Sequence, residues 1–449
     1  MIDYKNIFAG KRITVMGLGV LGRGVGDAEF LAQCGAQVIA TDLRSEYELA
    51  SSVEKLKQYP NISFHLGGHM GDDFTDTDLV IKAAGVPLDS PFIAMARKAH
   101  VPVAMSTALF AKYASDAGVQ IVGVTGTRGK STVSHMIFHA LRQSSGQERR
   151  VFLGGNVRGV STLAQLPEVE KGDIAILELD SWQLQGFRDL LLSPQIAIFT
   201  NLMPDHLNYY PDMEAYFEDK ASIFRNQKNN DVLIVGQSVA NRIYSADPPA
   251  RPTVPGALPP DWHLLIPGVH NRENASLAAA ALKALGLEES EIKQGLVTFG
   301  GVEGRLQLVG ERNGVKIYND NNSTTPEATI AALRALNDGF RKSIILIIGG
   351  SDKGLQLEEL VEEIKKSVAY IILLAHPNYK GSARLAGLFK KKGIAYEEAN
   401  SLTQAIGSAF AKASDGPILF SPALASFGMF KNEYDRGDQF LAAVKAHLS

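Results

Sequence analysis

An apolar run at residues 121–125 leads into a glycine-rich turn, and Gly129-Lys130-Ser131-Thr132 then opens a helix. Backbone N–H groups in such a turn point at phosphate oxygens, Lys130 can reach β- and γ-phosphates, and a hydroxyl of Ser131 or Thr132 can bind Mg²⁺. The usual pattern has a glycine at the place of Val124, whereas this chain has glycines at 123 and 126. We therefore expect a nucleoside triphosphate site here, with a plain glycine-rich turn as the alternative.

Short β-branched or aliphatic runs alternate with helical patterns along the whole chain. This alternation predicts α/β layers built on largely parallel sheets. The predicted strands are Ile13–Met16, Gln37–Thr41, Leu79–Lys82, Ile121–Thr125, Ile174–Leu179, Ile196–Thr200, Val232–Val235, Ile344–Ile348, Ile371–Leu374 and Ile418–Phe420. The proline-rich segment Asp247–Asp261 cannot be a helix or a central strand, and we expect it to be a surface excursion.

A chain of 449 residues is long enough for about three domains, at roughly 150 residues each. We expect an N-terminal Rossmann-like nucleotide-binding domain at 1–106, a central P-loop ATPase-like α/β domain at 107–301, and a C-terminal Rossmann-like α/β domain at 302–449. The formal net charge of −3 gives no basic signature, so nucleic acid is not an expected partner. Cys34 stands alone, which excludes a disulfide framework, and no long apolar run or signal segment is present. The composition therefore predicts a cytoplasmic protein without stable membrane contact.

A second glycine-rich strand exit, Gly17-Leu18-Gly19-Val20-Leu21-Gly22, follows the first predicted strand. Asp42 stands at the end of the next strand, about 20 residues further on, as in dinucleotide-binding units. The pattern alone is weak and permits a nicotinamide cofactor. A nucleotide-sugar substrate fits two phosphate-binding turns in one chain better.

Three polar residues after the triphosphate turn are candidates for metal binding or catalysis. Glu178 closes a predicted strand, where carboxylates of open α/β sheets face the ligand and can hold Mg²⁺. His206 follows another strand and is either a metal ligand or an ordinary loop histidine. Lys220 lies on a predicted helix, one turn after Tyr216, and its position alone indicates only a solvated charge.

These motifs stand in one order along the chain and resemble the Mur ligase family. They are Val124–Thr132, Gly154-Gly155-Asn156, Glu178–Leu184, Asn201 with Asp205-His206, Tyr216 with Lys220, and Gly268–Asn274. The tail from Leu419 to Gly437 resembles the MurD type in particular. The resemblance implies a monomeric ATP-dependent amide-bond ligase that adds D-glutamate to UDP-N-acetylmuramoyl-L-alanine, through an acyl phosphate, in peptidoglycan precursor synthesis.

The resemblance also implies a role for each matching position. Catalytic positions would be Lys130, Asn156, His206 and Lys220. Two Mg²⁺ ions would be served by Ser131, Glu178, His206 and Lys220, the last as a carbamate formed with CO₂. ATP would contact Gly126, Thr127, Gly129, Lys130, Ser131, Thr132, Asn271, Asn274, Arg305 and Asp320. The UDP substrate would contact Gly17, Gly19, Val20, Leu21, Gly22, Asp42 and Arg44. The incoming glutamate would contact Thr324, Lys353, Ser426 and Phe427.

Four positions depart from the family pattern. Asn322 replaces a lysine, Gly304 replaces a histidine before Arg305, Leu21 replaces a threonine, and Glu433 stands where an aromatic residue often follows Lys-Asn. These changes leave the identity and stereochemistry of the added amino acid open, so L-glutamate is an alternative. A folylpolyglutamate-synthase-like ligase is another, and a nucleotide-binding regulator or redox protein is the alternative from a different class.

Overall fold

The computed structural model describes residues 4–19, 22–87, 89–144, 149–157, 159–206, 209–337 and 342–448. The chain forms two compact units, one made of Met1–Leu258 with Glu273–Leu296 and the other of Pro259–Arg272 with Val297–Ser449. Two sheets lie in the first unit and one in the second. No helix within the described ranges is both long and apolar enough to span a membrane.

The first sheet is parallel and has the order β3-β2-β1-β4-β5. Its strands are β1 Arg12–Met16, β2 Gln37–Asp42, β3 Ile62–Leu66, β4 Leu79–Lys82 and β5 Val103–Ala104. The helices of this part are α1 Tyr4–Phe8, α2 Arg23–Gln33, α3 Ala50–Leu56, α4 Asp72–Thr75 and α5 Pro91–Lys98. The central strand β1 ends directly before the glycine turn, so its register with β2 brings that turn to the edge where Asp42 ends its strand.

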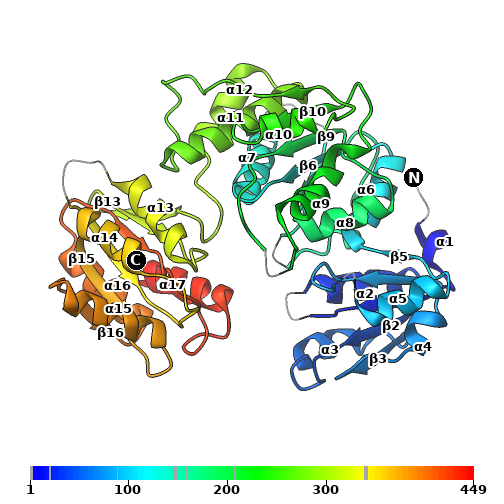
Figure 1. Cartoon of the computed structure of the whole chain (residues 1–449), viewed down its shortest axis with the longest axis horizontal. Helices are drawn as coiled ribbons and strands as arrows, with labels where there is room; N and C mark the ends of the chain where they lie inside the picture. The colour runs from blue at the N-terminus through cyan, green and yellow to red at the C-terminus, as the bar shows by residue number, and fades with distance from the viewer. Residues whose placement is uncertain are drawn as a thin grey trace. The chain divides into compact units, whose positions relative to one another are not determined.

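The second sheet, also parallel, has the order β11-β10-β9-β6-β8-β7. Its strands are β6 Gln120–Thr125, β7 Val151–Gly155, β8 Ile174–Glu178, β9 Ile196–Phe199, β10 Val232–Val235 and β11 Pro252–Thr253. The helices are α6 Ser106–Asp116, α7 Lys130–Gln143, the 3₁₀ helix η1 Leu163–Glu168, α8 Ser181–Asp189, α9 Met213–Arg225, α10 Ala240–Ser245, α11 Val269–Ala284 and α12 Glu289–Val297. Helices α8 and α9 pack against each other beside this sheet (Figure 1).

Buried aliphatic side chains explain why these runs form central strands. The four residues of β9 and all five of β8 are buried, which is the pattern of a parallel sheet covered on both faces. Most of the proline-rich segment is exposed or half-buried, but Pro252–Thr253 pairs with β10 at the sheet edge and Ala250 is fully buried. An edge strand tolerates proline because one side of it needs no ladder hydrogen bonds.

The third sheet is mixed, with the order β12-β13-β17-β14-β15-β16 and one antiparallel pair, β12 with β13. Its strands are β12 Gln307–Arg312, β13 Val315–Asn319, β14 Ile344–Ile348, β15 Val368–Leu374, β16 Glu397–Ala399 and β17 Ile418–Phe420. Its helices are α13 Pro326–Leu336, α14 Glu358–Ser367, α15 Lys380–Lys391, α16 Leu402–Lys412 and α17 Glu433–Leu448. The α/β class and the three sheet-based domains agree with the sequence prediction. The boundaries at 106/107 and 301/302 remain predictions.

Candidate active site

The triphosphate turn joins the end of β6 to the start of α7 and requires glycine at two places. Gly126 has φ +136° and Gly129 has φ +85°, which side chains rarely adopt. A Cβ on Gly126 would lie 2.0 Å from Oγ1 of Thr200, and one on Gly129 would lie 2.3 Å from Oδ1 of Asn274. The turn is therefore shaped by its neighbours as well as by its own sequence.

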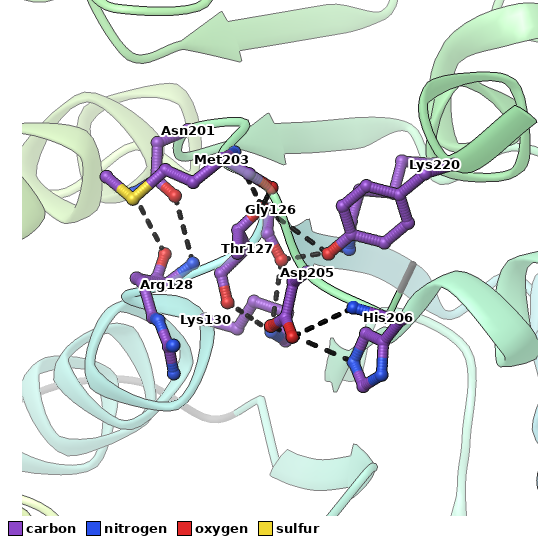
Figure 2. Close-up of polar contacts among 10 residues, drawn as sticks. Gly126, Thr127, Arg128, Lys130, Asn201, Met203, Asp205, His206 and Lys220 are labelled. Atoms are coloured by element: carbon purple, nitrogen blue, oxygen red, sulfur yellow. Dashed lines mark hydrogen bonds and ion pairs between the residues drawn. The ribbon is translucent and has the colours of Figure 1, made fainter. Parts of the chain in front are cut away.

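The exit of β9 supports this turn from the side. The backbone N–H of Thr127 donates to the carbonyl of Asn201 at 2.9 Å, and that of Arg128 donates to Oδ1 of Asn201 at 2.9 Å (Figure 2). The hydroxyl of Thr200 donates to the carbonyl of Arg128 at 2.5 Å. These two amides already have partners, so the helix start that bears Ser131 and Thr132 is a part of the turn where backbone N–H groups can face an anion.

Two lysines converge on the carbonyl of Gly126 (Figure 2). Nζ of Lys130 donates to it at 3.0 Å and Nζ of Lys220 at 2.9 Å, while Lys130 also donates to the carbonyl of Thr127 at 3.1 Å. Lys220 is 1% exposed, and its Nζ lies 4.8 Å from the centre of the Tyr216 ring. Burial, and then the charge of Lys130, hold the pKa of Lys220 well below its ordinary value. The position of Lys220 on a helix indicated a solvated charge, but the structure shows it buried and hydrogen-bonded to the phosphate turn.

Glu178 is the last residue of β8, in register with Val124 of the neighbouring strand β6. It is 4% exposed, and within the described ranges its carboxylate has no hydrogen bond or ion pair. Its main-chain carbonyl accepts a hydrogen bond from the backbone N–H of Asn156 at 2.8 Å. A carboxylate at this strand end that has no protein partner in the described part is available to bind a cation.

His206 and Asp205 follow β9 in the next turn (Figure 2). The backbone of His206 has φ +54°, and its N–H donates to Oδ1 of Asp205 at 3.0 Å. Its ring lies 4.9 Å from that of Trp182, and its side chain is 40% exposed. No group of three His, Cys, Asp or Glu side chains suited to a metal occurs in the described part. Oxygen donors from Ser131 and Glu178 are nevertheless the ligand type that Mg²⁺ takes, often with water completing its shell.

In the N-terminal sheet the second glycine turn is braced by Asp42. Its Oδ2 accepts a hydrogen bond from the N–H of Gly19 at 2.9 Å, and its Oδ1 accepts one from the N–H of Arg44 at 2.9 Å. Gly17, Gly19 and Gly22 all have positive φ. Val20 and Leu21 lie outside the described residues. The structure thus brings Gly19, Asp42 and Arg44 together at the carboxyl edge of β1 and β2.

In the second unit, two of the predicted amino-acid-binding residues meet. Nζ of Lys353 donates to the hydroxyl of Thr324 at 3.1 Å. Ser426 is buried and its carbonyl accepts a hydrogen bond from Tyr379, while Phe427 is 61% exposed and its carbonyl accepts one from Ser351.

The predicted ATP residues of the second unit are held by local bonds. Asp320 accepts hydrogen bonds from the N–H of Leu306 at 3.0 Å and the hydroxyl of Ser421 at 2.7 Å, and burial raises its pKa to about 6. The charge of Arg305 opposes that rise. The side-chain amide of Asn271 donates to the carbonyl of Pro267 at 2.7 Å. Asn274 belongs to the first unit, beside Gly129.

Two departures from the family pattern touch each other. The N–H of Asn322 donates to the carbonyl of Gly304 at 2.8 Å, and a Cβ on Gly304 would lie 2.9 Å from Nδ2 of Asn322. Gly304 also has φ +71°. The two departures therefore belong together, because Gly304, which replaces the histidine, leaves room for the side-chain amide of Asn322, which replaces the lysine.

The sequence suggested Arg436 only as one of two cations that could neutralise Glu433, and the structure shows it as a fully buried side chain of α17. Its Nε and Nη2 donate to Oδ1 and the carbonyl of Asn321 at 2.7 and 2.8 Å, and its Nη1 donates to the carbonyl of Leu424 at 3.2 Å. Burial lowers the pKa of Arg436 to about 10. Arg436 orders the loop next to Lys353 and Thr324. Its place in the quoted tail motif was the only signal in the sequence.

Family models match the chain in all three parts. Residues 11–105 match the Mur ligase MurD-like N-terminal domain, residues 124–247 the Mur ligase middle domain, and residues 304–423 the Mur ligase glutamate ligase domain. Among solved structures, UDP-N-acetylmuramate-alanine ligase MurC from Thermotoga maritima is similar with a TM-score of 0.61 at 18% identity, covering 97% of this chain and all of that one. MurF ligase from the same organism, in complex with ADP, has a TM-score of 0.56 at 15% identity and covers 92% of this chain and 95% of that one.

Curated relatives align along almost the full length. The UDP-N-acetylmuramoylalanine–D-glutamate ligase of Roseiflexus sp. (strain RS-1) is 35% identical, over 98% of this chain and 99% of the relative. The protein of the same name from Borreliella afzelii (strain PKo) is 34% identical over 96% of each chain. With the phosphate turn, Glu178 and Lys220 assembled as described, this extent of similarity places the chain in the Mur ligase family, among its MurD-type members.

Proposed function

We propose that this chain is an ADP-forming ligase that joins D-glutamate to UDP-N-acetylmuramoyl-L-alanine, a step of peptidoglycan precursor synthesis. The observation that carries the proposal is the cluster of Lys130, Lys220 and the carbonyl of Gly126 beside the strand end that bears Glu178. The names of the aligned relatives support the choice of substrates. A nucleotide-binding regulator would need no buried lysine from another helix at its phosphate turn.

The chemistry explains the residue types at this site. A free carboxylate does not form an amide with an amine at a useful rate, because its oxide is a poor leaving group. Phosphorylation of the carboxylate by ATP gives an acyl phosphate, the amine of the amino acid attacks its carbonyl carbon, and phosphate leaves from a tetrahedral intermediate. Such phosphoryl transfer depends on positioning and on charge stabilisation. Lys130 and the first-turn amides of α7 would hold the phosphates while the carboxylate approaches.

The residues at the turn fit a role for Mg²⁺, and we propose two metal sites. Ser131 and Glu178 would hold the first ion, and His206 with Lys220 would hold the second. The ions would offset the repulsion between the phosphates and the substrate carboxylate. The position of Glu178 at the end of β8, without a hydrogen bond or ion pair to any described residue, supports the first assignment.

Lys220 would contribute as a carbamate formed with CO₂, in which its amine nitrogen bonds to carbon and a proton is released. Its burial supports this assignment, as does the lack of any ion pair to its Nζ in the described part. The resulting anion is a suitable ligand for Mg²⁺, whereas an ammonium group is not.

The remaining assignments follow the same proposal. The turn from Gly17 to Gly22 with Asp42 and Arg44 would receive the UDP group, and Thr324, Lys353, Ser426 and Phe427 would receive glutamate. Asn271, Asn274, Arg305 and Asp320 would complete the ATP site. We propose a monomeric enzyme with domains at 1–106, 107–301 and 302–449.

A substrate panel tests the proposal directly. ATP, Mg²⁺ and UDP-N-acetylmuramoyl-L-alanine are offered with D-glutamate, L-glutamate, D-aspartate or meso-diaminopimelate, and phosphate release and product mass are recorded. We expect turnover with D-glutamate, and loss of at least about 10²-fold in Lys130→Ala, the scale for removing one charge-stabilising group. Exposed Lys112→Ala is the matched control and should retain wild-type activity. Turnover with L-glutamate alone would select the alternative ligase, and no turnover with any of the four amino acids would refute the substrate assignment.

A further inference from the structure

The segment that follows β7 and carries Asn156 is packed against helix α2 of the N-terminal sheet. Nη1 of Arg23 donates to Oδ1 of Asn156 at 3.0 Å, across 133 residues of sequence. One helical turn further along α2, Oδ1 of Asp27 accepts a hydrogen bond from the hydroxyl of Ser161 at 2.7 Å. A Cβ on Gly26 would lie only 2.6 Å from Cβ of Ser161. Two polar contacts and a close backbone approach thus join these elements within the first unit.

The contact with Arg23 determines which end of the Asn156 amide faces the helix. A guanidinium group has N–H donors and no acceptor, so only the carbonyl oxygen of the amide can face it. The NH₂ group of Asn156 then points away from Arg23. Among the described residues it has no acceptor. Asn156 therefore offers two N–H donors to a ligand, and its backbone is fixed by the bond to the carbonyl of Glu178.

Arg23 is also the first residue of α2, directly after Gly22 at the end of the N-terminal glycine turn. The buried carboxylate of Asp27 attracts its guanidinium group from the next turn of the helix. A ligand with its phosphates on that glycine turn would therefore lie beside a cation that is already bonded to Asn156. Arg23 links the turn of the first sheet to the segment next to Glu178 of the second.

We propose that Arg23 is a positioning residue for the ligation. It fixes the amide of Asn156 so that the NH₂ group donates to the reacting carboxylate of the UDP-linked substrate. This inference rests on the proposed function, because it takes that carboxylate as the ligand of Asn156. Asp27 and Ser161 hold the two segments at the separation that the contact needs.

A double-mutant cycle on substrate binding tests the coupling. The dissociation constant of UDP-N-acetylmuramoyl-L-alanine is measured by calorimetry for wild type, Arg23→Met, Asn156→Ala and the double variant, with the Michaelis constant for ATP and the thermal midpoint of each active protein. Arg12→Met is the matched control, since Arg12 forms an exposed pair with Asp76 at the opposite end of β1. Binding is measured because it remains accessible in a variant without turnover.

Arg23→Met and Asn156→Ala should each weaken substrate binding about tenfold, as expected for one charge-assisted hydrogen bond. The double variant should bind within about twofold of Asn156→Ala, because the two residues act through one contact. The Michaelis constant for ATP and the behaviour of Arg12→Met should match wild type.

The inference would be overturned if the double variant bound the UDP substrate about hundredfold more weakly than wild type, the product of the two single effects. Wild-type binding in Arg23→Met would also overturn it. If the thermal midpoint of Arg23→Met is lower than that of Arg12→Met, Arg23→Gln replaces Arg23→Met in the cycle. The same changes in the dissociation constant are then expected. Wild-type protein that neither binds nor converts the UDP substrate would refute the proposed function. An active wild type with independent effects would refute only the role of Arg23.

Discussion

Replacing Gly126 by alanine should destabilise the first unit, because the added methyl group has no space. The Cβ would meet Oγ1 of Thr200 at 2.0 Å and the backbone N of Asn201 at 3.0 Å, at a φ of +136°. Left-handed strain costs about 1–3 kcal/mol, overpacking adds about 1–3 kcal/mol, and loss of the Thr200 bond to Arg128 adds about 1 kcal/mol. The free energy of unfolding should therefore fall by about 3–7 kcal/mol, the sum of these three effects.

Urea unfolding followed by tryptophan fluorescence measures this change. The chain has two tryptophans, Trp182 in the first unit and Trp262 in the second, so a Trp262→Phe background reports on the first unit alone. Gly256→Ala is the matched control, since no atom lies within 4 Å of its Cβ and its φ is not positive. ADP affinity is measured in parallel. Equal unfolding midpoints and equal ADP affinity in Gly126→Ala and the control would contradict the described turn.

Three further changes test separate parts of the site. Lys220→Ala should lose turnover and regain part of it with acetate, which supplies the missing anion, and no recovery over a concentration series would argue against the carbamate. Burial raises the pKa of Asp320 from its ordinary 3.8 to about 6. Ionised Asp320 therefore lowers the stability of the folded protein at neutral pH, and this cost disappears as pH falls through about 6 toward 4. Relative to Asp320→Asn, wild type should gain unfolding free energy between pH 7 and 4.5, and parallel pH curves would refute this. Glu433→Phe should change the ratio of kcat/KM for D-glutamate to that for L-glutamate if Glu433 contacts the amino acid, and an unchanged ratio would place it outside the pocket.

Strands with buried aliphatic runs could be predicted from the sequence, whereas the edge strands and one interior strand, β13, could not. Every predicted strand corresponds to an observed one with small shifts at its ends. The edge strand Glu397–Ala399 was missed because it contains two glutamates, and Val151–Gly155 because it ends in two glycines. The hairpin of β12 and β13 did carry a signal: Asn313 and Gly314, both with positive φ, form the two-residue turn that Asn-Gly favours.

Site residues that belong to a local motif could be predicted from the sequence, whereas the distant residues that contact them could not. Lys130 could be assigned from its own turn, since strand, glycines and helix start are contiguous. Lys220 received a role only through family resemblance, because its burial depends on packing against the turn that contains Gly126. The contact of Arg23 with Asn156 joins two domains, and no periodicity or spacing within either one indicates it.

The register of the central sheet also indicates where this protein tolerates alteration. Val124 pairs with Glu178 and Thr125 with Phe199, so the three functional turns leave from neighbouring strand ends on the carboxyl edge. The loops of the amino edge take no part in that geometry. The exposed residues 228–230 before β10 are therefore a suitable place for a fluorophore, an affinity tag or a surface tether. A label attached there should leave the catalytic activity of the protein unchanged.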